Sequence, residues 1–377
     1  MPDRTLSVAL IGTGFMAKAH SNAWRQAPHF FPLAADIRMA TICGRDPARS
    51  KKAAEQFGWA SSATDWEEVV ADPLIDVVDI CTPNDSHAPI AIAAARAGKA
   101  ILSEKPLARN VNEARQMTQA VKRARVVNMV THNYRRVPAI ALAKEMIDAG
   151  EIGDRIFHFR ARYAQDWIAG EDFPIVWRLR SRVAGSGALG DIGAHIVDLA
   201  RYLVGEIESV SAVSQTFVSR RPERARQNGR KRMVDVDDAV SVVGKFRHGS
   251  LLNLEATRFA HGRKNQLAFE INGSAGSIGF DLERMNELRF FNQRDPAARQ
   301  GFGDLLVTES SHPYVGKWWP PGHIIGYEHS FVHTIADFVN AVATNKSVEP
   351  SFLEGLKNQQ VLDAIARSAR RGGLIRL

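Results

Sequence analysis

The first 131 residues alternate short apolar runs with helix-periodic segments. The apolar runs, candidates for buried strands, cover residues 6–11, 38–43, 77–81, 100–103 and 126–131. Helical patterns lie between them at residues 15–27, 47–57, 87–97 and 112–123. Apolar strands that alternate with helices predict a parallel sheet covered on both faces. This half of the chain is therefore expected to be a doubly wound α/β domain.

The pattern changes after residue 131. A helix is expected at 138–150, and longer β-branched and aromatic runs follow at 155–163, 210–218, 239–246, 250–257, 266–271 and 277–280. Short turns such as Arg247-His248-Gly249 join successive runs, which predicts a mostly antiparallel sheet. Helical patterns at 328–343 and 352–369 close the chain. We predict an α/β domain over 1–131 and an α+β domain over 132–377, whose last helices could pack back on the first domain.

The composition is that of a soluble globular protein. With 377 residues, 45% hydrophobic and 24% charged, two domains are expected, and no apolar run approaches the roughly 20 residues of a membrane span. The chain runs from Met1 directly into a strand pattern without a signal peptide. Its only cysteines, Cys43 and Cys81, end apolar runs, so a disulfide framework is not expected and the cytoplasm is the predicted location.

One segment accounts for most of the positive charge. The net charge is +8, and residues 219–232 hold seven basic residues and one glutamate. Such a Pro- and Gly-containing stretch is typical of a solvated, mobile loop. Binding to nucleic acid is not favoured, because no interleaved aromatics or recognition-helix pattern accompany the basic residues.

The first predicted strand ends in a dinucleotide-binding pattern. Gly12-Thr13-Gly14-Phe15-Met16-Ala17 has the form G-x-G-x-x-A and opens a helix. Gly12 permits the tight turn, Gly14 lets the backbone approach a pyrophosphate, and Ala17 allows close helix packing. The positive end of the following helix attracts the anion. Because the motif stands at the start of a doubly wound domain, it predicts a bound nicotinamide dinucleotide.

The end of the second strand bears on the choice of cofactor. An acidic residue there would hold the ribose of NAD and repel the 2′-phosphate of NADP, whereas this strand ends in Gly44-Arg45-Asp46-Pro47. We expect Gly44 to leave room for a phosphate and Arg45 to supply its charge, or to stack on adenine. Asp46 is expected to cap the next helix, with Pro47 at its first position. NADP is therefore favoured over NAD.

Polar residues follow two further strands, at the edge where such sheets bind ligands. Thr82 and Asn84 are expected to line the cofactor, although Asn84 could equally cap the following helix. The next strand ends in Glu104-Lys105-Pro106, which is often only a surface turn. After a dinucleotide motif, however, it directs a lysine toward the cofactor, and Pro106 makes a cis bond possible.

A second polar cluster lies in residues 185–198, where glycines lead into an amphipathic helix. Asp191, His195 and Asp198 are spaced i, i+4 and i+7 and share one face of a helix. An imidazole beside carboxylates suits proton transfer. The alternative is a helix capped by Asp191 next to a structural histidine. The pair His329 and His333 could bind a metal, but no third ligand is evident and none is predicted.

Four motifs together resemble the glucose–fructose oxidoreductase/inositol dehydrogenase (Gfo/Idh/MocA) family. They are Gly12–Ala17, Thr82-Pro83-Asn84, Glu104-Lys105-Pro106 and residues 187–198, and Asn133-Tyr134-Arg135-Arg136 also fits. The resemblance covers nearly the whole chain in the family's order. Within the family it is most similar to the levoglucosan dehydrogenase branch, on residues 165–167, 256–263 and 312–320. Gly44-Arg45 departs from the family's NAD-dependent members, which usually carry an acidic residue there.

The resemblance implies a Rossmann domain followed by an α/β domain with a large open-faced sheet. It also implies that Lys105 is the catalytic lysine, with Asp191 and His195 as its partners. We expect His195 to accept the hydroxyl proton, Lys105 to polarise the oxygen, and Asp191 to bind a neighbouring hydroxyl or orient the ring. Asp198 is expected to support them. Further cofactor contacts are predicted at Phe15, Met16, His87, Glu104, Asn133 and Arg135, and further substrate contacts at Trp167, Trp177, Arg178, Arg258 and Tyr327.

The sequence thus predicts an NAD(P)-dependent dehydrogenase acting on a ring hydroxyl of a sugar, anhydrosugar or cyclitol. The open sheet predicts a homodimer or homotetramer, since an uncovered apolar face needs a partner. One alternative is a sugar sensor or co-regulator that kept the fold and lost catalysis. Another is a sugar–sugar oxidoreductase with tightly bound NADP, which the missing N-terminal arm and export signal disfavour.

Overall fold

The computed structural model describes residues 4–224 and 230–377 and divides the chain into two compact units. The first comprises Met1–Arg136 and Ile325–Gln359, and the second comprises Val137–Ile324 and Gln360–Leu377. Residues 132–136, assigned to the second domain from the sequence, therefore belong to the first unit by their contacts. Residues 325–359 also belong to it, in agreement with the prediction that the last helices could pack back on the first domain. Within the described residues, no helix combines the length and the apolar character needed to cross a bilayer.

The first unit is built on a six-stranded parallel sheet of order β3-β2-β1-β4-β5-β6. This is the predicted doubly wound arrangement, in which the order reverses between β1 and β4. The short β3 was not predicted, because its Ser-Ser-Ala sequence carries no strand signal. The strands are β1 (Thr5–Ile11), β2 (Asp36–Cys43), β3 (Ser61–Ala63), β4 (Val77–Ile80), β5 (Ala100–Ser103) and β6 (Asn128–Val130).

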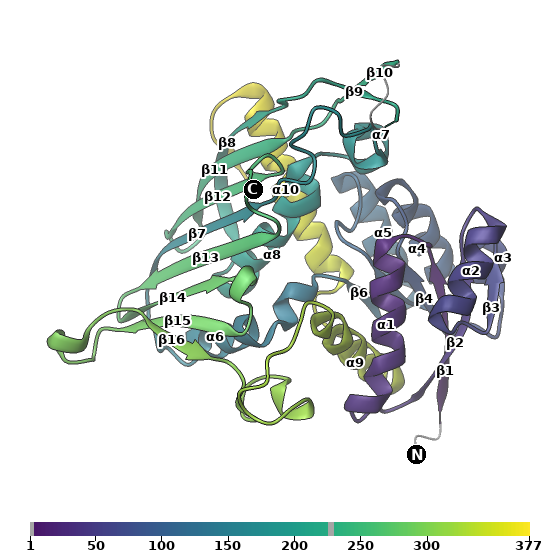
Figure 1. The fold of residues 1–377 in the computed structure, drawn as a ribbon, viewed down its shortest axis with the longest axis horizontal. Coiled ribbons are helices and arrows are strands. Elements are labelled where there is room, and N and C mark those ends of the chain that lie inside the picture. Colours follow the sequence, from purple (N-terminus) through teal and green to yellow (C-terminus); the bar gives the residue numbers. More distant parts are fainter. Residues whose placement is uncertain (1–3, 225–229) are drawn as a thin grey trace. The chain divides into compact units, whose positions relative to one another are not determined.

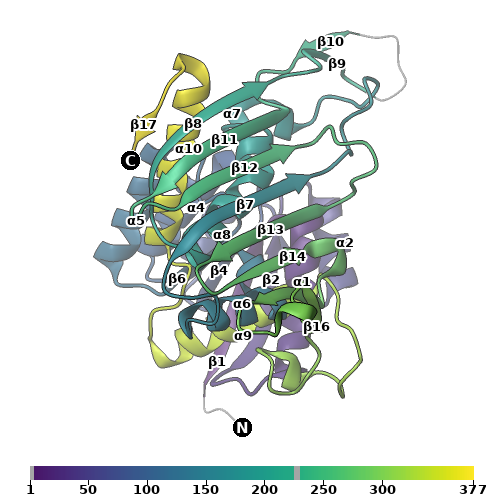
Figure 2. The ribbon, with the colours of Figure 1, turned by 90° about the vertical axis from the view of Figure 1, so that its left-hand side faces the viewer.

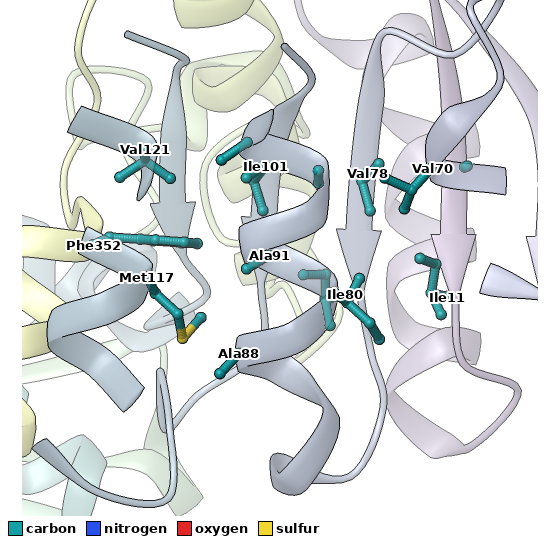
Figure 3. Close-up of a cluster of buried hydrophobic side chains, with 14 of the residues drawn as sticks. Ile11, Val70, Val78, Ile80, Ala88, Ala91, Ile101, Met117, Val121 and Phe352 are labelled. Atoms are coloured by element: carbon teal, nitrogen blue, oxygen red, sulfur yellow. The ribbon is translucent and has the colours of Figure 1, made fainter. Parts of the chain in front are cut away.

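Helices pack on both faces of this sheet. On one face, Val78, Ile80 and Ile101 of the strands form a core with α3, α4 and α5. Phe352, the first residue of α10, lies in the same core beside Met117 and Val121 (Figure 3). The helices of the unit are α1 (Phe15–Phe30), α2 (Pro47–Phe57), α3 (Trp66–Ala71), α4 (His87–Arg96), α5 (Val111–Ala124) and α9 (His329–Thr344), with the first turns of α10 (Phe352–Arg371).

The other face of the sheet is packed by α1, which lies beside α9 (Figure 1). Rings pair between the two helices: His20 lies 5.5 Å from Phe331, and Trp24 lies 6.4 Å from Phe338. Because side chains alternate along a strand, Val77 and Asp79 of β4 point away from the face that Val78 and Ile80 occupy. This alternation places the carboxylate of Asp79 under α1, where a buried charge needs partners.

The second unit holds a nine-stranded sheet of order β16-β15-β14-β13-β7-β12-β11-β8-β17. Only β7 and β12 pair in parallel, so the predicted mostly antiparallel sheet is confirmed. The strands are β7 (Ile156–Ala164), β8 (Ile207–Gln215), β11 (Ala239–Phe246), β12 (Leu251–Thr257), β13 (Gln266–Gly273), β14 (Gly276–Asp281), β15 (Glu287–Asn292), β16 (Gly303–Leu306) and β17 (Ile375–Arg376).

Helices cover one face of the large sheet, and Figure 2 shows the strands from the other face. The helices of this unit are α6 (Pro138–Asp148), α7 (Ser181–Ala184), α8 (Ala194–Leu203) and the remainder of α10. A shallow groove runs along the opposite face. Its lining includes exposed Val213 and Val243, the cations Arg160, Arg162, Arg284 and Arg289, and the acidic Glu255, Glu270, Asp281 and Asp304. Charged residues of both signs therefore line this face, beside a few apolar side chains.

The basic segment contains more structure than the predicted mobile loop. Its ends pair as two short antiparallel strands, β9 (Arg220–Pro222) and β10 (Lys231–Met233). Arg221 is fully buried and donates to the carbonyl oxygens of Ile168, Gly170 and Phe173. This arginine therefore holds the 168–173 loop in place, and the prediction of a solvated loop is wrong for it. Residues 225–229 of the segment lie outside the described residues.

Candidate active site

The parallel strands of the first unit end at one level. Ile11 pairs with Cys43 and with Ile80, and Ile80 pairs with Ser103. The residues that follow these four positions therefore emerge at the same carboxyl edge of the sheet, where ligands bind in doubly wound folds. They include the predicted cofactor residues Gly12, Gly44, Thr82 and Glu104.

Gly12 and Gly14 have different structural reasons to be glycine. Gly12 has φ +132°, and a Cβ at this residue would lie 2.5 Å from the carbonyl oxygen of Cys81. Gly14 is the N-cap of α1 and makes no side-chain cap, and no described atom lies within 4 Å of the place its Cβ would take. Phe15 is 66% exposed and Met16 is half-buried. The helix start is thus open to an anionic group, which fits the pyrophosphate of a dinucleotide.

The structure corrects one prediction at the end of β2 and confirms another. A Cβ on Gly44 would lie 2.6 Å from Cγ2 of Thr13, so the missing side chain makes room for the protein itself and not for a phosphate. Asp46 accepts the N–H of Arg49 at 3.1 Å as the N-cap of α2, with Pro47 at the first position, as predicted. Arg45 is exposed beside this cap. Its role toward the cofactor stays a prediction.

His87 joins two of the loops at this edge. Its ring is fully buried, with Nε2 3.0 Å from the carbonyl oxygen of Thr82 and Nδ1 3.1 Å from that of Pro106. Burial lowers the pKa of His87 and so favours the neutral ring, whose single N–H donates to one of these two carbonyl oxygens. Asn84 begins a 3-10 turn (Asn84–Ser86) and is not the N-cap of α4, which is Ser86. The predicted alternative that Asn84 caps the following helix is therefore wrong.

The candidate catalytic lysine lies just beyond β5. Lys105 is half-buried, and its peptide bond to Pro106 is cis. The preceding Glu104 is buried, and its Oε2 accepts the backbone N–H of Lys105 at 3.2 Å. The backbone on both sides of Lys105 is therefore anchored, through Glu104 before it and through the carbonyl of Pro106 after it.

Beneath this turn lies a buried charge cluster that the sequence analysis missed. His20 of α1 is 1% exposed, with Nδ1 2.9 Å from Oδ2 of Asp79 and Nε2 3.0 Å from Oε1 of Glu104. Burial works against the charged ring, but Asp79 outweighs it and the pKa of His20 is raised well above its usual value. The position of His20 on the inward face of α1 could have indicated that the ring is buried, but not that Asp79 and Glu104 are its partners.

Asn133, Arg135 and Tyr327 are packed into the same unit. Asn133 is buried and donates from Nδ2 to Oγ of Ser330 at 2.8 Å, and Arg135 is also buried. The ring of Tyr327 lies edge-on to that of Tyr134 at 6.4 Å, and burial raises its pKa. Contacts of these residues with cofactor or substrate stay predictions.

In the second unit, the helix that carries Asp191 and His195 begins differently from the prediction. Residues Leu189–Gly193 form a π-helical turn that leads into α8. The N-cap position is Ala188 and Asp191 lies inside the turn, so the alternative that Asp191 caps the helix is wrong. Asp237 instead accepts the N–H groups of Gly187 and Leu189, each at 2.7 Å. Turns of the π type occur often at functional sites.

Asp191 lies between two guanidinium groups. Its carboxylate oxygens are 3.8 Å from Nε of Arg178 and 3.6 Å from Nη1 of Arg258. Arg258 is fully buried and donates to the carbonyl oxygen of Asp237 at 3.1 Å. The two cations stabilise the ionised form of Asp191, which then accepts hydrogen bonds only. The side chain is 19% exposed, so this acceptor remains within reach of a ligand.

Two tryptophans join this group through the arginines. Arg178 lies over the ring of Trp177 at 4.3 Å, and Arg258 lies 5.9 Å from that of Trp167. Trp167 is 37% exposed and packs edge-on against Phe173. The structure therefore brings five predicted substrate residues, namely Trp167, Trp177, Arg178, Asp191 and Arg258, into one cluster of aromatic faces and charged groups, a combination that suits a sugar ring.

His195 and Asp198 face the interior of the second unit. His195 is 6% exposed and its ring lies 5.8 Å from that of Tyr163 on β7, at a tilt of 53°. Asp198 is 1% exposed, which fits its predicted supporting role better than contact with substrate. Asp191, on the π turn, is therefore more exposed to solvent than His195, which lies one turn later on α8.

Metal binding receives no support from the histidine pair on α9. His333 is fully buried beside the carbonyl oxygen of Arg136 at 2.8 Å, and burial lowers its pKa to about 3. Over the described part of the chain, the one cluster of three potential ligands is His20, Asp79 and Cys81. Both ring nitrogens of His20 already face carboxylates, so this cluster is a hydrogen-bond network rather than an ion site.

Comparisons with known proteins identify relatives of both units of the chain. Residues 6–132 match a family described as an oxidoreductase family with an NAD-binding Rossmann fold, and residues 140–279 match a GFO/IDH/MocA C-terminal domain. A levoglucosan dehydrogenase of Pseudarthrobacter phenanthrenivorans is 46% identical, covering 98% of this chain and 97% of that protein. A D-apiose dehydrogenase of Paraburkholderia graminis is 32% identical, covering 98% of this chain and 89% of that protein. A levoglucosan dehydrogenase structure with NADH and levoglucosan superposes with a TM-score of 0.95, at 46% identity over 99% of both chains.

Proposed function

Because the chain belongs to the Gfo/Idh/MocA family of NAD-binding oxidoreductases, we propose that it dehydrogenates a ring hydroxyl of a sugar, anhydrosugar or cyclitol. The likeness to levoglucosan dehydrogenase over nearly the full length is the observation that carries this proposal. It puts anhydrosugars first among the candidate substrates. The sequence retains Lys105, Asp191 and His195, which disfavours the alternative of a non-catalytic sensor.

The proposed chemistry converts a secondary alcohol to a ketone. The nicotinamide dinucleotide, when bound, supplies the hydride acceptor. His195 accepts the hydroxyl proton, and the ammonium of Lys105 stabilises the negative charge that develops on the oxygen. Asp191 accepts a hydrogen bond from a neighbouring hydroxyl and so orients the ring, with Arg178 and Arg258 holding it ionised. Trp167 and Tyr327 are the proposed apolar contacts of the sugar.

The cofactor-holding residues proposed are those of the sheet edge. Gly12 and Gly14 with the start of α1 would hold the pyrophosphate, and Thr82 and Asn84 would line the nicotinamide half. The remaining contacts proposed are Phe15, Met16, Arg45, His87, Glu104, Lys105, Asn133 and Arg135. NADP is proposed over NAD on the charge of Arg45 and the absence of an acidic residue at that position, although the solved levoglucosan dehydrogenase at 46% identity carries NADH.

We also propose that the protein is a homo-oligomer that pairs through the open sheet face, and that it works in the cytoplasm. The equal number of cations and carboxylates lining the groove supports pairing of two copies, because such a face is complementary to itself. Both cysteines are free and buried, as suits a reducing compartment. Either a dimer or a tetramer would cover the open face of the sheet.

A screen of cofactor reduction tests the proposed function. The purified protein is mixed with NAD or NADP and with levoglucosan, common pyranoses and inositols in turn, and formation of reduced cofactor is followed. We expect turnover with at least one anhydrosugar, sugar or cyclitol. Binding of NAD or NADP without its reduction by any of these compounds would instead support the sensor alternative.

A further inference from the structure

The buried cluster beneath the Lys105 turn has a definite chemical organisation. His20 lies between Asp79 and Glu104, so each of its ring nitrogens faces a carboxylate oxygen at about the length of a charge-assisted hydrogen bond. A neutral imidazole carries a single N–H and could donate to one carboxylate only. Two donations therefore require the imidazolium. The indole of Trp24 also donates to Asp79, from Nε1 to Oδ2 at 2.7 Å.

The charges of the surrounding groups support this protonation state. Asp79 faces His20 from β4, Cys81 from the end of β4, and Glu104 from the end of β5, and the uncharged ring of Phe331 packs against it from α9. Burial raises the pKa of the Cys81 thiol, which stays neutral. Although burial favours a neutral Glu104, the hydrogen bond and charge of His20 outweigh it and lower the pKa of that carboxyl, with smaller contributions from Lys105 and His87.

Glu104 transmits this arrangement to the lysine. Its Oε1 faces His20 and its Oε2 accepts the backbone N–H of Lys105, so one carboxylate links α1 to the turn. The backbone of Glu104 is fixed as well, because its N–H donates to the carbonyl oxygen of Ile80 at 2.9 Å. Rotation of the Glu104 side chain would break both side-chain contacts at once.

We infer that His20, held by Asp79, is a positioning residue for Lys105 and acts through Glu104. The imidazolium fixes the Glu104 carboxylate, and that carboxylate fixes the backbone from which the Lys105 side chain departs. The buried set of Asp79, Glu104 and His20 carries one net negative charge, which balances the ammonium of Lys105 at the sheet edge. The inference rests on the proposed function, because it presupposes that Lys105 takes part in the reaction.

The first test compares His20→Gln with a matched control. Glutamine can donate to one carboxylate but not to both, so we expect kcat to fall about 10- to 100-fold, as for other groups that orient a reactive residue, with the Kd for NADH nearly unchanged. Trp59→Phe serves as the control. It removes a buried hydrogen bond to Ser21, the neighbour of His20 on α1, without touching the cluster. We expect this variant to lose thermal stability but to keep its kcat.

A second variant, Asp79→Asn, keeps the shape of the cluster and removes one charge. The pKa of His20 should then fall toward its usual value of about 6.5 or below. We expect kcat of this variant to decline as the pH rises through that region, whereas kcat of the wild type should not show this decline. The double variant Asp79→Asn/His20→Gln should not show it either, because the titrating group is gone.

Lys105→Ala, measured alongside, separates the two claims. Loss of activity in Lys105→Ala with wild-type kcat in His20→Gln would overturn the positioning role and leave the proposed function intact. Full activity in Lys105→Ala would overturn the catalytic role of the lysine itself. A loss of kcat that follows the loss of melting temperature equally in His20→Gln and Trp59→Phe would also overturn the inference, since it would mark general destabilisation.

Discussion

Arg45 is the residue on which the proposed cofactor preference depends. It is exposed at the end of β2, next to the Asp46 cap, and the neighbouring Gly44 is packed against Thr13. The sequence predicts that Gly44 and Arg45 together accommodate a 2′-phosphate. In the structure Gly44 packs against Thr13, so of the two residues Arg45 alone could contact that phosphate. A guanidinium binds such a group through charge-assisted hydrogen bonds, which NAD cannot supply.

Replacing Arg45 by alanine should therefore affect the two cofactors unequally. A hydrogen bond to a charged group contributes about 1.5–3 kcal/mol, so kcat/KM with NADP should fall about 10- to 100-fold while that with NAD changes little. Lys52→Ala, which removes an exposed cation from the following helix α2, is the control. Turnover of the wild type is compared at equal concentrations of NAD and NADP. A strong wild-type preference for NAD would contradict the proposal.

Individual residues were predictable where their reason is local. The positive φ of Gly12 and the cap formed by Asp46 follow from a few neighbouring residues. His20 was missed because its partners are 59 and 84 positions away in the sequence, and a histidine on the inward face of a helix gives no sign of them. Arg221 escaped notice for the same reason: a basic stretch does not reveal which guanidinium finds buried carbonyl oxygens.

At the scale of elements, the start of the helix that carries Asp191 and His195 is the informative case. The sequence predicts one α-helix, but the chain forms a π turn over Leu189–Gly193 first. Gly187 packs against the backbone of Asp237, whose carboxylate accepts two N–H groups of this loop. These contacts come from a segment 50 residues away, so periodicity in the helix itself could not indicate them.

Gly187→Ala should disturb this start. A Cβ there would lie 1.7 Å from the carbonyl oxygen of Asp237, so the loop must shift. Overpacking of this kind costs about 1–3 kcal/mol, and we expect a lower melting temperature together with a raised KM for the sugar. Gly170→Ala is the control, because no described atom lies within 4 Å of its Cβ position. Equal behaviour of the two variants in calorimetry and kinetics would refute this account of the loop.

Long apolar strands and helices were predicted closely, whereas the edges of the sheets were not. The predicted 239–246 run and the 47–57 helix match β11 and α2 residue for residue. None of the four residues of the edge strand β16 is buried, and β17 has only two residues, so neither has an alternating apolar pattern to detect. Short exposed strands owe their conformation to a neighbouring strand, which is information that a local sequence window lacks.

At the scale of the whole molecule, the sequence predicts two parts but not their exact membership. Residues 325–359 return to the first unit, where Phe352 enters the core and its N–H donates to Oδ1 of Asn128 at 2.8 Å. A helical pattern near the end of a chain shows that a helix exists, and it does not show which core receives its apolar face.

The proposed oligomer can be tested on the open sheet. Val243→Asp would place an unpaired charge among the residues that line the groove, where Val243 is 56% exposed. Burying that charge against a second copy is unfavourable, so we expect dissociation by light scattering. Leu74→Asp, at a residue 70% exposed in the first unit, is the control and should leave the mass unchanged. A monomeric wild type would contradict the proposal.

The central claim is that Lys105 and His195 carry out sugar dehydrogenation. The most direct measurement is the rate at which NAD or NADP, whichever the wild type uses better, is reduced with levoglucosan or with the best compound of the screen, for the wild type and for Lys105→Ala and His195→Ala. We expect turnover to fall by several orders of magnitude in each variant, with the cofactor still bound, because each removes a group that acts on the transition state. Near-native turnover in either variant would contradict the claim.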